Sequence, residues 1–249
     1  MTLLKVDKLS KIFGGLTALD AVSLSIEDGE IHGLMGANGA GKTTLFSIIA
    51  GNQRPSSGTV HFAGARIDRL RPDQICRKGI ARTFQIVRPF AGLTVRDNVE
   101  TAMLFGQTEA LSPRERDRLI GSILGECGLD GLADRVASSL TLSARKRLEV
   151  ARALATGPRL LLLDEVMAGL TPTEVTDMIA ALKRVKDNHG LTILIIEHVM
   201  SALNQMSDRI TVLHRGQLIA EGTPEDIARN PQVAEAYFGV DDSELEGRP

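Results

Sequence analysis

The chain has 249 residues, of which 43% are apolar, enough for one large domain or two small ones with a hydrophobic core. Its net charge of −2, its 3% aromatic content and its lack of Trp argue against a nucleic-acid surface or a platform for stacked bases. The two cysteines do not make a disulfide framework, and neither the early charge at Lys5 nor the short apolar run 160–163 fits a signal peptide or a membrane span, so we expect a reducing cytoplasm and a peripheral membrane role at most.

Two segments near the N-terminus, 3–9 and 22–26, alternate apolar and polar residues. This period of two is typical of half-exposed antiparallel strands. Phe13 is expected in the loop between them, before Gly14 and Gly15.

A glycine-rich stretch follows the apolar segment 31–35 and precedes apolar residues at helical spacing that end at Gly51. Gly, four residues and Gly-Lys-Thr between a strand and a helix is the pattern of a phosphate-binding loop, whose N–H groups surround a phosphate at a helix N-terminus. Lys42 would reach the β- and γ-phosphates of a nucleotide, and the Thr43 hydroxyl would ligate Mg²⁺. A turn that contains Lys-Thr by chance is disfavoured by the strand and the helix. The candidate nucleotide ligands here are Gly36, Ala37, Asn38, Gly39, Ala40, Gly41, Lys42, Thr43 and Thr44.

Phe13 lies shortly before this loop on an otherwise polar connection. A lone Phe is usually a core residue. Because of the neighbouring loop, stacking on adenine and packing in the core are equally open for Phe13.

Further strands and a helical block follow. A hairpin is expected at 59–62 through Ala63-Gly64, a short helix at 70–78, and a strand at 80–84 that ends at Gln85. Residues 93–157 are helical in character. Thr94 is a helix cap, Ser112 opens a capping box, and a third helix is expected from Leu142 to Thr156. The sequence therefore predicts a helical subdomain inserted between strands.

Two acids, Asp164 and Glu165, directly follow the apolar run 160–163. A continuous apolar run this short indicates a strand buried on both faces of a parallel sheet. The carboxyl end of such a strand, beside a phosphate loop, is where an α/β sheet binds its ligand. Asp164 would hold Mg²⁺ directly or through water, and Glu165 would face the attacking water. An ordinary polar strand end is the less favoured alternative.

The C-terminal third repeats this arrangement. A capping box at Thr171 opens a helix that ends at Gly190, and a buried strand at 192–196 leads to His198. A lone histidine is seldom catalytic, but a strand end in a nucleotide-binding sheet favours a role for His198. A hairpin at 209–221 and one more helix, from Thr223, are expected next. The histidines without such a context, to which no role is assigned, are His32, His61, His189 and His214.

In this order, the phosphate loop, Gln85, a helix opening before Arg147, the acid pair and His198 resemble the ATP-binding subunit of an ABC transporter. The resemblance covers nearly the whole chain. It implies an α/β fold of the P-loop NTPase (RecA-like) type, with a mostly parallel sheet core, an N-terminal antiparallel β subdomain and an inserted helical subdomain. One nucleotide-binding domain over 1–249 would then divide into a core at 1–92 and 158–240, the helical subdomain at 93–157 and a flexible tail at 241–249.

The resemblance also implies roles for the site residues. Phe13 would stack on adenine. Gln85 would touch Mg²⁺ and water and sense the membrane partner. Glu165 would be the catalytic base or water-orienting acid, and His198 the switch histidine at the γ-phosphate. With Lys42, these residues form the expected catalytic set for hydrolysis of MgATP.

One departure from the family matters. Where the family has Leu-Ser-Gly-Gly-Gln, this chain has Leu140-Thr141-Leu142-Ser143-Ala144. Thr141 replaces the serine and Ser143 a glycine, so a hydroxyl and a helix N-terminus survive while the close-approach glycines and the Gln are lost. In this family each ATP lies between one subunit's phosphate loop and the other's signature, so Thr141 and Ser143 would contact the partner's ATP. We therefore expect a second, different ATP-binding subunit and two unequal sites.

Residues 80–85 and 235–239 further resemble the branched-chain amino acid importer subfamily, whose members also carry amides, urea or aromatic acids. The resemblance implies two permease subunits, a periplasmic solute-binding protein as an indirect partner, no nucleic acid, and a place on the cytoplasmic face of the inner membrane. Residues 86–95 are apolar enough either to contact a permease or to pack on the helical subdomain. The alternatives are the ATPase of a lipopolysaccharide-type exporter and a soluble, non-transport ABC ATPase.

Overall fold

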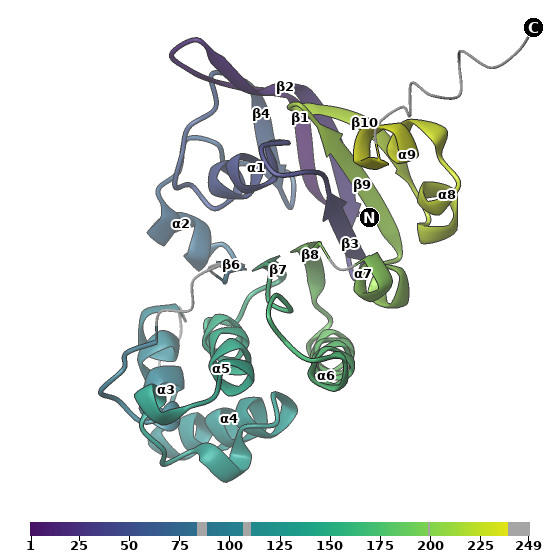
Figure 1. The fold of residues 1–249 in the computed structure, drawn as a ribbon. Coiled ribbons are helices and arrows are strands. Elements are labelled where there is room, and N and C mark those ends of the chain that lie inside the picture. The colour runs from purple at the N-terminus through teal and green to yellow at the C-terminus, as the bar shows by residue number, and fades with distance from the viewer. Residues whose placement is uncertain (84–88, 107–110, 199, 239–249) are drawn as a thin grey trace, which may run out of the picture.

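The antiparallel sheet contains the N-terminal strands (Figure 1). A computed structural model describes residues 1–83, 89–106, 111–198 and 200–238. The antiparallel sheet has the strand order β2-β1-β4-β5, and β1 and β2 form its long outer hairpin. The strands are β1 (Thr2–Phe13), β2 (Leu16–Glu27), β4 (Ser57–Phe62) and β5 (Ala65–Arg66).

The second sheet is mostly parallel and has the order β10-β9-β3-β8-β7-β6. All its neighbouring strands run parallel except the edge pair β9 and β10. The carboxyl ends of β3, β7 and β8 therefore meet at one edge of the sheet. The strands are β3 (Ile31–Met35), β6 (Ile80–Arg82), β7 (Leu160–Asp164), β8 (Thr192–Ile196), β9 (Arg209–His214) and β10 (Gln217–Gly222).

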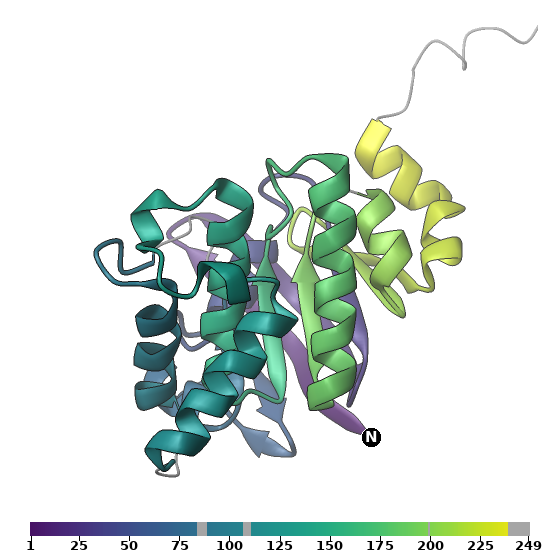
Figure 2. The same ribbon diagram turned by 90° about the horizontal axis from the view of Figure 1, so that it is seen from below.

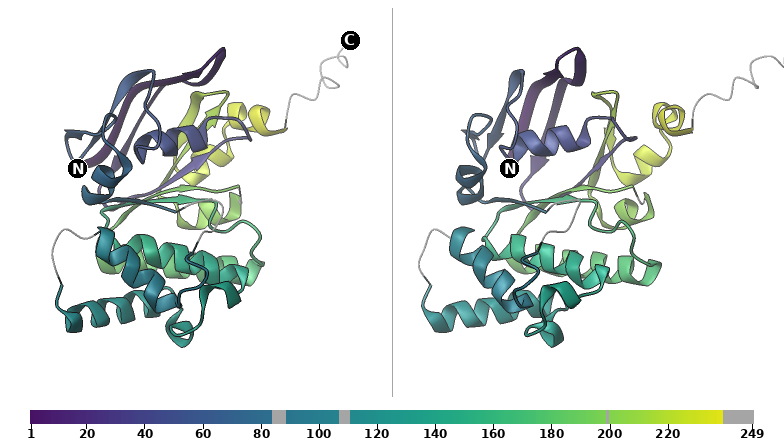
Figure 3. Two further views of the ribbon diagram at one scale, coloured as in Figure 1. Left: turned by 90° about the vertical axis from the view of Figure 1, so that its left-hand side faces the viewer. Right: turned by 60° about the vertical axis from the view of Figure 1, so that its left-hand side comes forward.

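Helices cover both faces of this sheet. Helix α1 lies between the two sheets, while α3, α4, α5 and α6 form a layer on the opposite face (Figures 2 and 3). The helices are α1 (Lys42–Ile49), α2 (Pro72–Arg77), α3 (Val95–Gly106), α4 (Pro113–Glu126), α5 (Leu142–Ala155), α6 (Pro172–His189), α7 (Met200–Met206), α8 (Pro224–Ala228) and α9 (Pro231–Phe238), with short 3₁₀ turns at Asp130–Leu132 and Ala137–Ser139.

The sheet separates two hydrophobic clusters, and its strands supply both. Leu161 and Leu163 of β7 pack with the helical layer, whereas Leu160 and Leu162 pack with α1 and the antiparallel sheet. Strand β8 alternates in the same way. Because successive side chains of a strand point to opposite faces, a strand covered on both faces has to be apolar throughout. The sequence-based prediction of buried strands at 160–163 and 192–196 is confirmed.

The predicted helix starts are confirmed by their caps. Ser112 opens a capping box at α4, and Thr171 opens one at α6. The Thr94 hydroxyl accepts a hydrogen bond from Asp97 N–H at 3.0 Å. Each of these side chains satisfies a backbone donor that the first helical turn leaves without a partner. The helical block predicted at 93–157 contains α3, α4 and α5.

Two sequence-based predictions need correction, and one helix was missed. Phe13 is not in a loop, because it ends β1 and pairs with Leu16 across the turn at Gly14-Gly15. The outer half of this hairpin is exposed and is stabilised by backbone pairing between the strands. Its residues therefore show no alternation of apolar and polar side chains. Two C-terminal helices replace the single one expected, since the Asn230 side chain caps a new start at α9. Helix α7 was not predicted.

Candidate nucleotide-binding site

The phosphate loop follows β3 and is held between two other strands. Gly36 and Gly41 have φ angles of +151° and +104°. A Cβ atom on Gly36 would lie 2.4 Å from the Leu213 carbonyl oxygen, and one on Gly41 would lie 2.6 Å from that of Ala18. Glycine is required at both positions, because the backbones of β2 and β9 approach the loop too closely for any side chain.

Lys42 is the first residue of α1, and its ammonium group lies inside this loop. Its Nζ donates to the carbonyl oxygens of Gly36, at 2.6 Å, and Ala37, at 3.1 Å. Burial lowers the pKa of Lys42, and the carboxylates of Glu165 and Asp164 oppose that shift. The buried cation, next to exposed backbone at 37–39, makes the loop suited to an anion.

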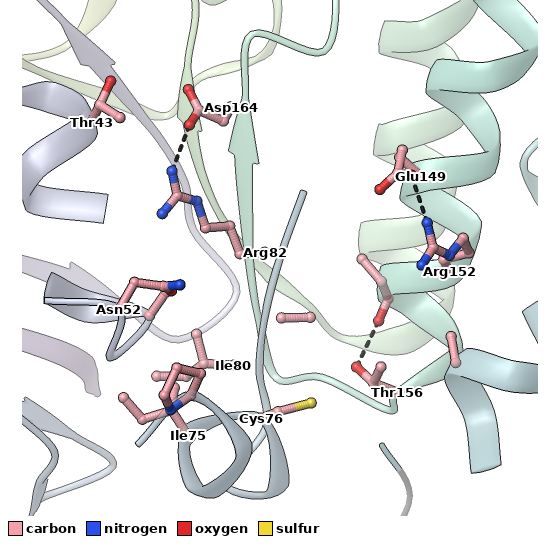
Figure 4. Close-up of a pocket in the computed structure, with 15 residues that line it drawn as sticks. Thr43, Asn52, Ile75, Cys76, Ile80, Arg82, Glu149, Arg152, Thr156 and Asp164 are labelled. Atoms are coloured by element: carbon pink, nitrogen blue, oxygen red, sulfur yellow. Dashed lines mark hydrogen bonds and ion pairs between the residues drawn. The ribbon is translucent and has the colours of Figure 1, made fainter. Parts of the chain in front are cut away.

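Asp164 ends β7 and is 2% exposed. Its Oδ2 accepts a hydrogen bond from Arg82 Nη2 at 2.9 Å, and its backbone N–H donates to Thr83 Oγ1 at 3.1 Å. Its Oδ1 is buried and has no hydrogen-bond partner among the described residues. The exposed Thr43 borders the same cleft (Figure 4). An unpaired carboxylate oxygen and a hydroxyl that border one cleft are oxygen donors of the kind that Mg²⁺ accepts, so the residues present fit this ion.

Glu165 and His198 meet at the ends of neighbouring strands. His198 Nε2 lies 2.9 Å from Glu165 Oε1. Glu165 adopts the left-handed conformation, with φ of +51°, and its N–H donates to the Ile196 carbonyl oxygen at 3.0 Å. Lys146 Nζ donates to the Glu165 carbonyl oxygen at 2.7 Å. Such a backbone conformation in a non-glycine residue is uncommon and is held by its surroundings, which aim the carboxylate at the histidine.

The other residues predicted for nucleotide contacts lie on other elements. Phe13 is 42% exposed at the tip of the β1–β2 hairpin, with Lys11 Nζ 4.8 Å from its ring centre. Thr141 caps α5, on the opposite face of the sheet from α1. Ser143 is buried and lies near Glu174 of α6, where it helps Thr171 to lower the pKa of that carboxyl. Gln85 lies outside the described residues. Of the two hydroxyl residues in the altered signature 140–144, Thr141 is the exposed one.

The chain matches the model of the ABC transporter family over residues 19–168, more than half of its length. The chain belongs to this family. It is an ATP-binding cassette with the ATPase fold of its relatives. A second family model, described as the branched-chain amino acid ATP-binding cassette transporter, matches the cassette at 217–243.

Named relatives and solved structures match almost the whole cassette. It is 39% identical to the high-affinity branched-chain amino acid transport ATP-binding protein BraF of Pseudomonas aeruginosa, covering 95% of this chain and 98% of that protein. It is 37% identical to the probable branched-chain amino acid transport ATP-binding protein LivG of Archaeoglobus fulgidus, covering 99% of each. The ADP conformation of the ATP-binding cassette MJ1267 is similar with a TM-score of 0.85 and 31% identity, covering 96% of this chain and 99% of that one. Among the described residues of the cassette, every helix is too short or too polar to cross a bilayer.

Sequence reasoning missed three residues of the site. Arg82 and Lys146 contact the acid pair, as described above. Tyr237, on α9, has its pKa raised by burial, and the nearby backbone N–H of Gly36 in the phosphate loop opposes that shift. For Arg82 there was a signal, namely a cation within an otherwise apolar strand candidate. Tyr237 was quoted only for its resemblance to a subfamily.

The buried carboxyl group of Glu197 should make the free energy of unfolding depend on pH. It is 2% exposed and accepts a hydrogen bond from Met167 N–H at 2.8 Å. Burial raises its pKa from 4.5 to about 7. Between these two values the unfolded chain binds fewer protons than the folded one, so the free energy of unfolding falls as the pH rises. In Glu197→Gln this fall, on the order of 2–3 kcal/mol, should disappear.

Urea unfolding of the wild type and of Glu197→Gln at pH 5 and pH 8 measures this effect. The exposed Glu225→Gln is the matched control and should keep the pH dependence of the wild type. Parallel pH curves for the wild type and Glu197→Gln would show that Glu197 does not titrate in this range.

Proposed function

We propose that this cassette is the ATP-hydrolysing subunit of an importer for branched-chain amino acids or related small polar solutes, such as amides, urea or aromatic acids. The observation that carries the proposal is the match of residues 217–243 to the branched-chain amino acid family model. The names of the relatives support the same solute class. That C-terminal match favours the importer over a lipopolysaccharide-type exporter and over a soluble, non-transport ATPase.

The proposed reaction is the hydrolysis of ATP to ADP and phosphate. The N–H groups of the phosphate loop and the Lys42 ammonium hold the β- and γ-phosphates. Glu165 orients the attacking water and accepts its proton, while His198 holds the Glu165 carboxylate at 2.9 Å. Thr43, Asp164 and Gln85 would hold Mg²⁺, which would supply positive charge to the phosphates. Phe13 and Thr44 complete the nucleotide contacts in this proposal.

We further propose that the partner cassette is a different chain. The support is an intact phosphate loop and acid pair beside an altered signature, in which Ser143 is buried near Glu174 and, of the two hydroxyl residues, only Thr141 is exposed. Thr141 and the start of α5 would face the partner's ATP, and Ser143 would act only through the helix start that it helps to pack. The two sites would therefore be unequal. Equal single-turnover hydrolysis at both sites of the assembled pair would contradict this proposal.

The proposed assembly contains two permease subunits, with a periplasmic solute-binding protein as an indirect partner. The cassette would lie peripherally on the cytoplasmic face of the inner membrane. Exposed Phe90 and Leu93 support contact with a permease at 89–95, since they are 47% and 39% exposed. Residues 86–88, the remainder of that predicted contact, lie outside the described residues.

A pull-down tests the assembly. Tagged Glu165→Gln cassette, loaded with MgATP, is recovered from detergent-solubilised membranes, and its partners are identified by mass spectrometry. Two permease subunits with a second, different ATPase are expected, and the same chain without MgATP is the control. Recovery of soluble partners alone, or of nucleic acid, would overturn the transporter assignment and leave the ATPase in place.

A further inference from the structure

Arg82 joins the metal-binding edge of the sheet to the helix that follows the phosphate loop. It ends β6 with its side chain 11% exposed. Its Nη2 donates to Asp164 Oδ2 at 2.9 Å and its Nη1 to Ser47 Oγ of α1 at 3.2 Å. The guanidinium carbon also lies 5.8 Å from the centre of the Phe46 ring. These contacts hold the Arg82 guanidinium against the carboxylate.

The two oxygens of the Asp164 carboxylate have different surroundings. Oδ2 is bound by Arg82, whereas Oδ1 is buried without a hydrogen-bond partner in the described chain. Arg82, Asp164 and Thr43 line one cleft of about 720 Å³, and Figure 4 shows the Arg82 guanidinium reaching the Asp164 carboxylate within it. A buried carboxylate needs a counter-charge; Arg82 supplies one through a direct hydrogen bond, while the Lys42 ammonium acts on Asp164 through space.

We infer that Arg82 is a counter-charge of Asp164 in the metal-free cassette, and that it lowers the affinity of this site for a divalent cation. The inference rests on the proposal that Asp164 holds Mg²⁺. A cation bound at Oδ1 lies close to the guanidinium on Oδ2, and like charges at short range in a buried site repel strongly. The nucleotide phosphates then have to bring the cation into the site, so that the cassette without nucleotide stays metal-free.

Orientation alone would give the opposite result. If Arg82 served only to aim the carboxylate, its removal would weaken cation binding. Other contacts already aim Asp164, because its backbone lies within β7 and its N–H donates to the Thr83 hydroxyl. We therefore expect loss of repulsion to outweigh loss of orientation, and the sign of the change in affinity separates the two roles.

Mn²⁺ is the probe, and electron paramagnetic resonance of free Mn²⁺ measures its binding to the full chain with and without ADP. Arg82→Met and Arg82→Gln remove the charge, and Gln keeps a donor for Asp164. Both should bind Mn²⁺ about 10-fold more tightly than the wild type. Arg82→Lys keeps the charge and should stay near the wild type. If Arg82→Met fails to fold, Arg82→Gln carries the test.

Two further variants make the outcome decisive. Arg66→Met breaks an arginine–aspartate pair of similar geometry, Arg66 Nε to Asp68 Oδ1 at 2.9 Å in the antiparallel sheet, and should leave Mn²⁺ binding unchanged. Asp164→Asn should abolish most of the binding. The inference is overturned if the neutral Arg82 variants fold and bind Mn²⁺ no more tightly than the wild type. Unchanged binding in Asp164→Asn overturns the metal assignment itself, while the ATPase family remains established.

Discussion

Replacing Glu165 by Gln is expected to lower the turnover number for ATP by about 10²- to 10⁴-fold and to leave ATP binding intact. Gln has the same shape as Glu and can still hydrogen-bond to His198, which lies 2.9 Å from Glu165 Oε1. It cannot accept a proton from the attacking water. The backbone contacts of Glu165 with Ile196 and Lys146 do not depend on the side chain and should persist.

Phosphate release and equilibrium binding of ATP, measured on the same preparation, check this result. Glu225→Gln removes an exposed carboxylate on α8 and should keep the turnover of the wild type. Turnover of Glu165→Gln at the level of the wild type would remove Glu165 from the mechanism.

Replacing Lys42 by Met should weaken ATP binding by about 10- to 150-fold, since a hydrogen bond to a charged group contributes about 1.5–3 kcal/mol. The Lys42 ammonium is the buried cation inside the phosphate loop. In the structure it bonds to the carbonyl oxygens of Gly36 and Ala37, and it would exchange these for phosphate oxygens. Met keeps the length of the side chain and removes the charge.

Isothermal titration with ATP gives the affinity, and thermal unfolding without nucleotide shows whether the loop remains folded. Lys5→Met, on the exposed face of β1, is the control and should bind like the wild type. An unchanged ATP affinity in folded Lys42→Met would place the phosphates elsewhere.

Where a local pattern reflects burial or capping, the sequence predicted the fold. The apolar run 160–163 is short and covered on both faces, so it could only be a buried strand. The capping boxes at Ser112 and Thr171 are local too, because the cap and its partner lie three residues apart. The end of β1 at Phe13 was missed because pairing of exposed backbone leaves no apolar pattern to read.

The individual residues of the candidate site could be predicted from the sequence, but the contacts between them could not. The phosphate loop, Asp164, Glu165 and His198 stand at strand ends, and parallel order brings those ends together. The contact of Arg82 with Asp164 joins residues 82 positions apart, and its partner depends on which strands are neighbours. Similarly, nothing near Ser143 in the sequence indicates that the residue lies close to Glu174.

The division of the core by the six-stranded sheet has a consequence for how the cassette opens. The cluster beside α1 and the cluster beside α3–α6 share no side chain, so either layer can loosen while the other stays packed. Strands β3, β7 and β8 supply side chains to both clusters, so we expect their backbone amides to exchange with solvent only when both layers open. Slow exchange should therefore concentrate in these strands, two of which end at Asp164 and at Ile196, so that the acid pair and the histidine project from the most persistent part of the molecule.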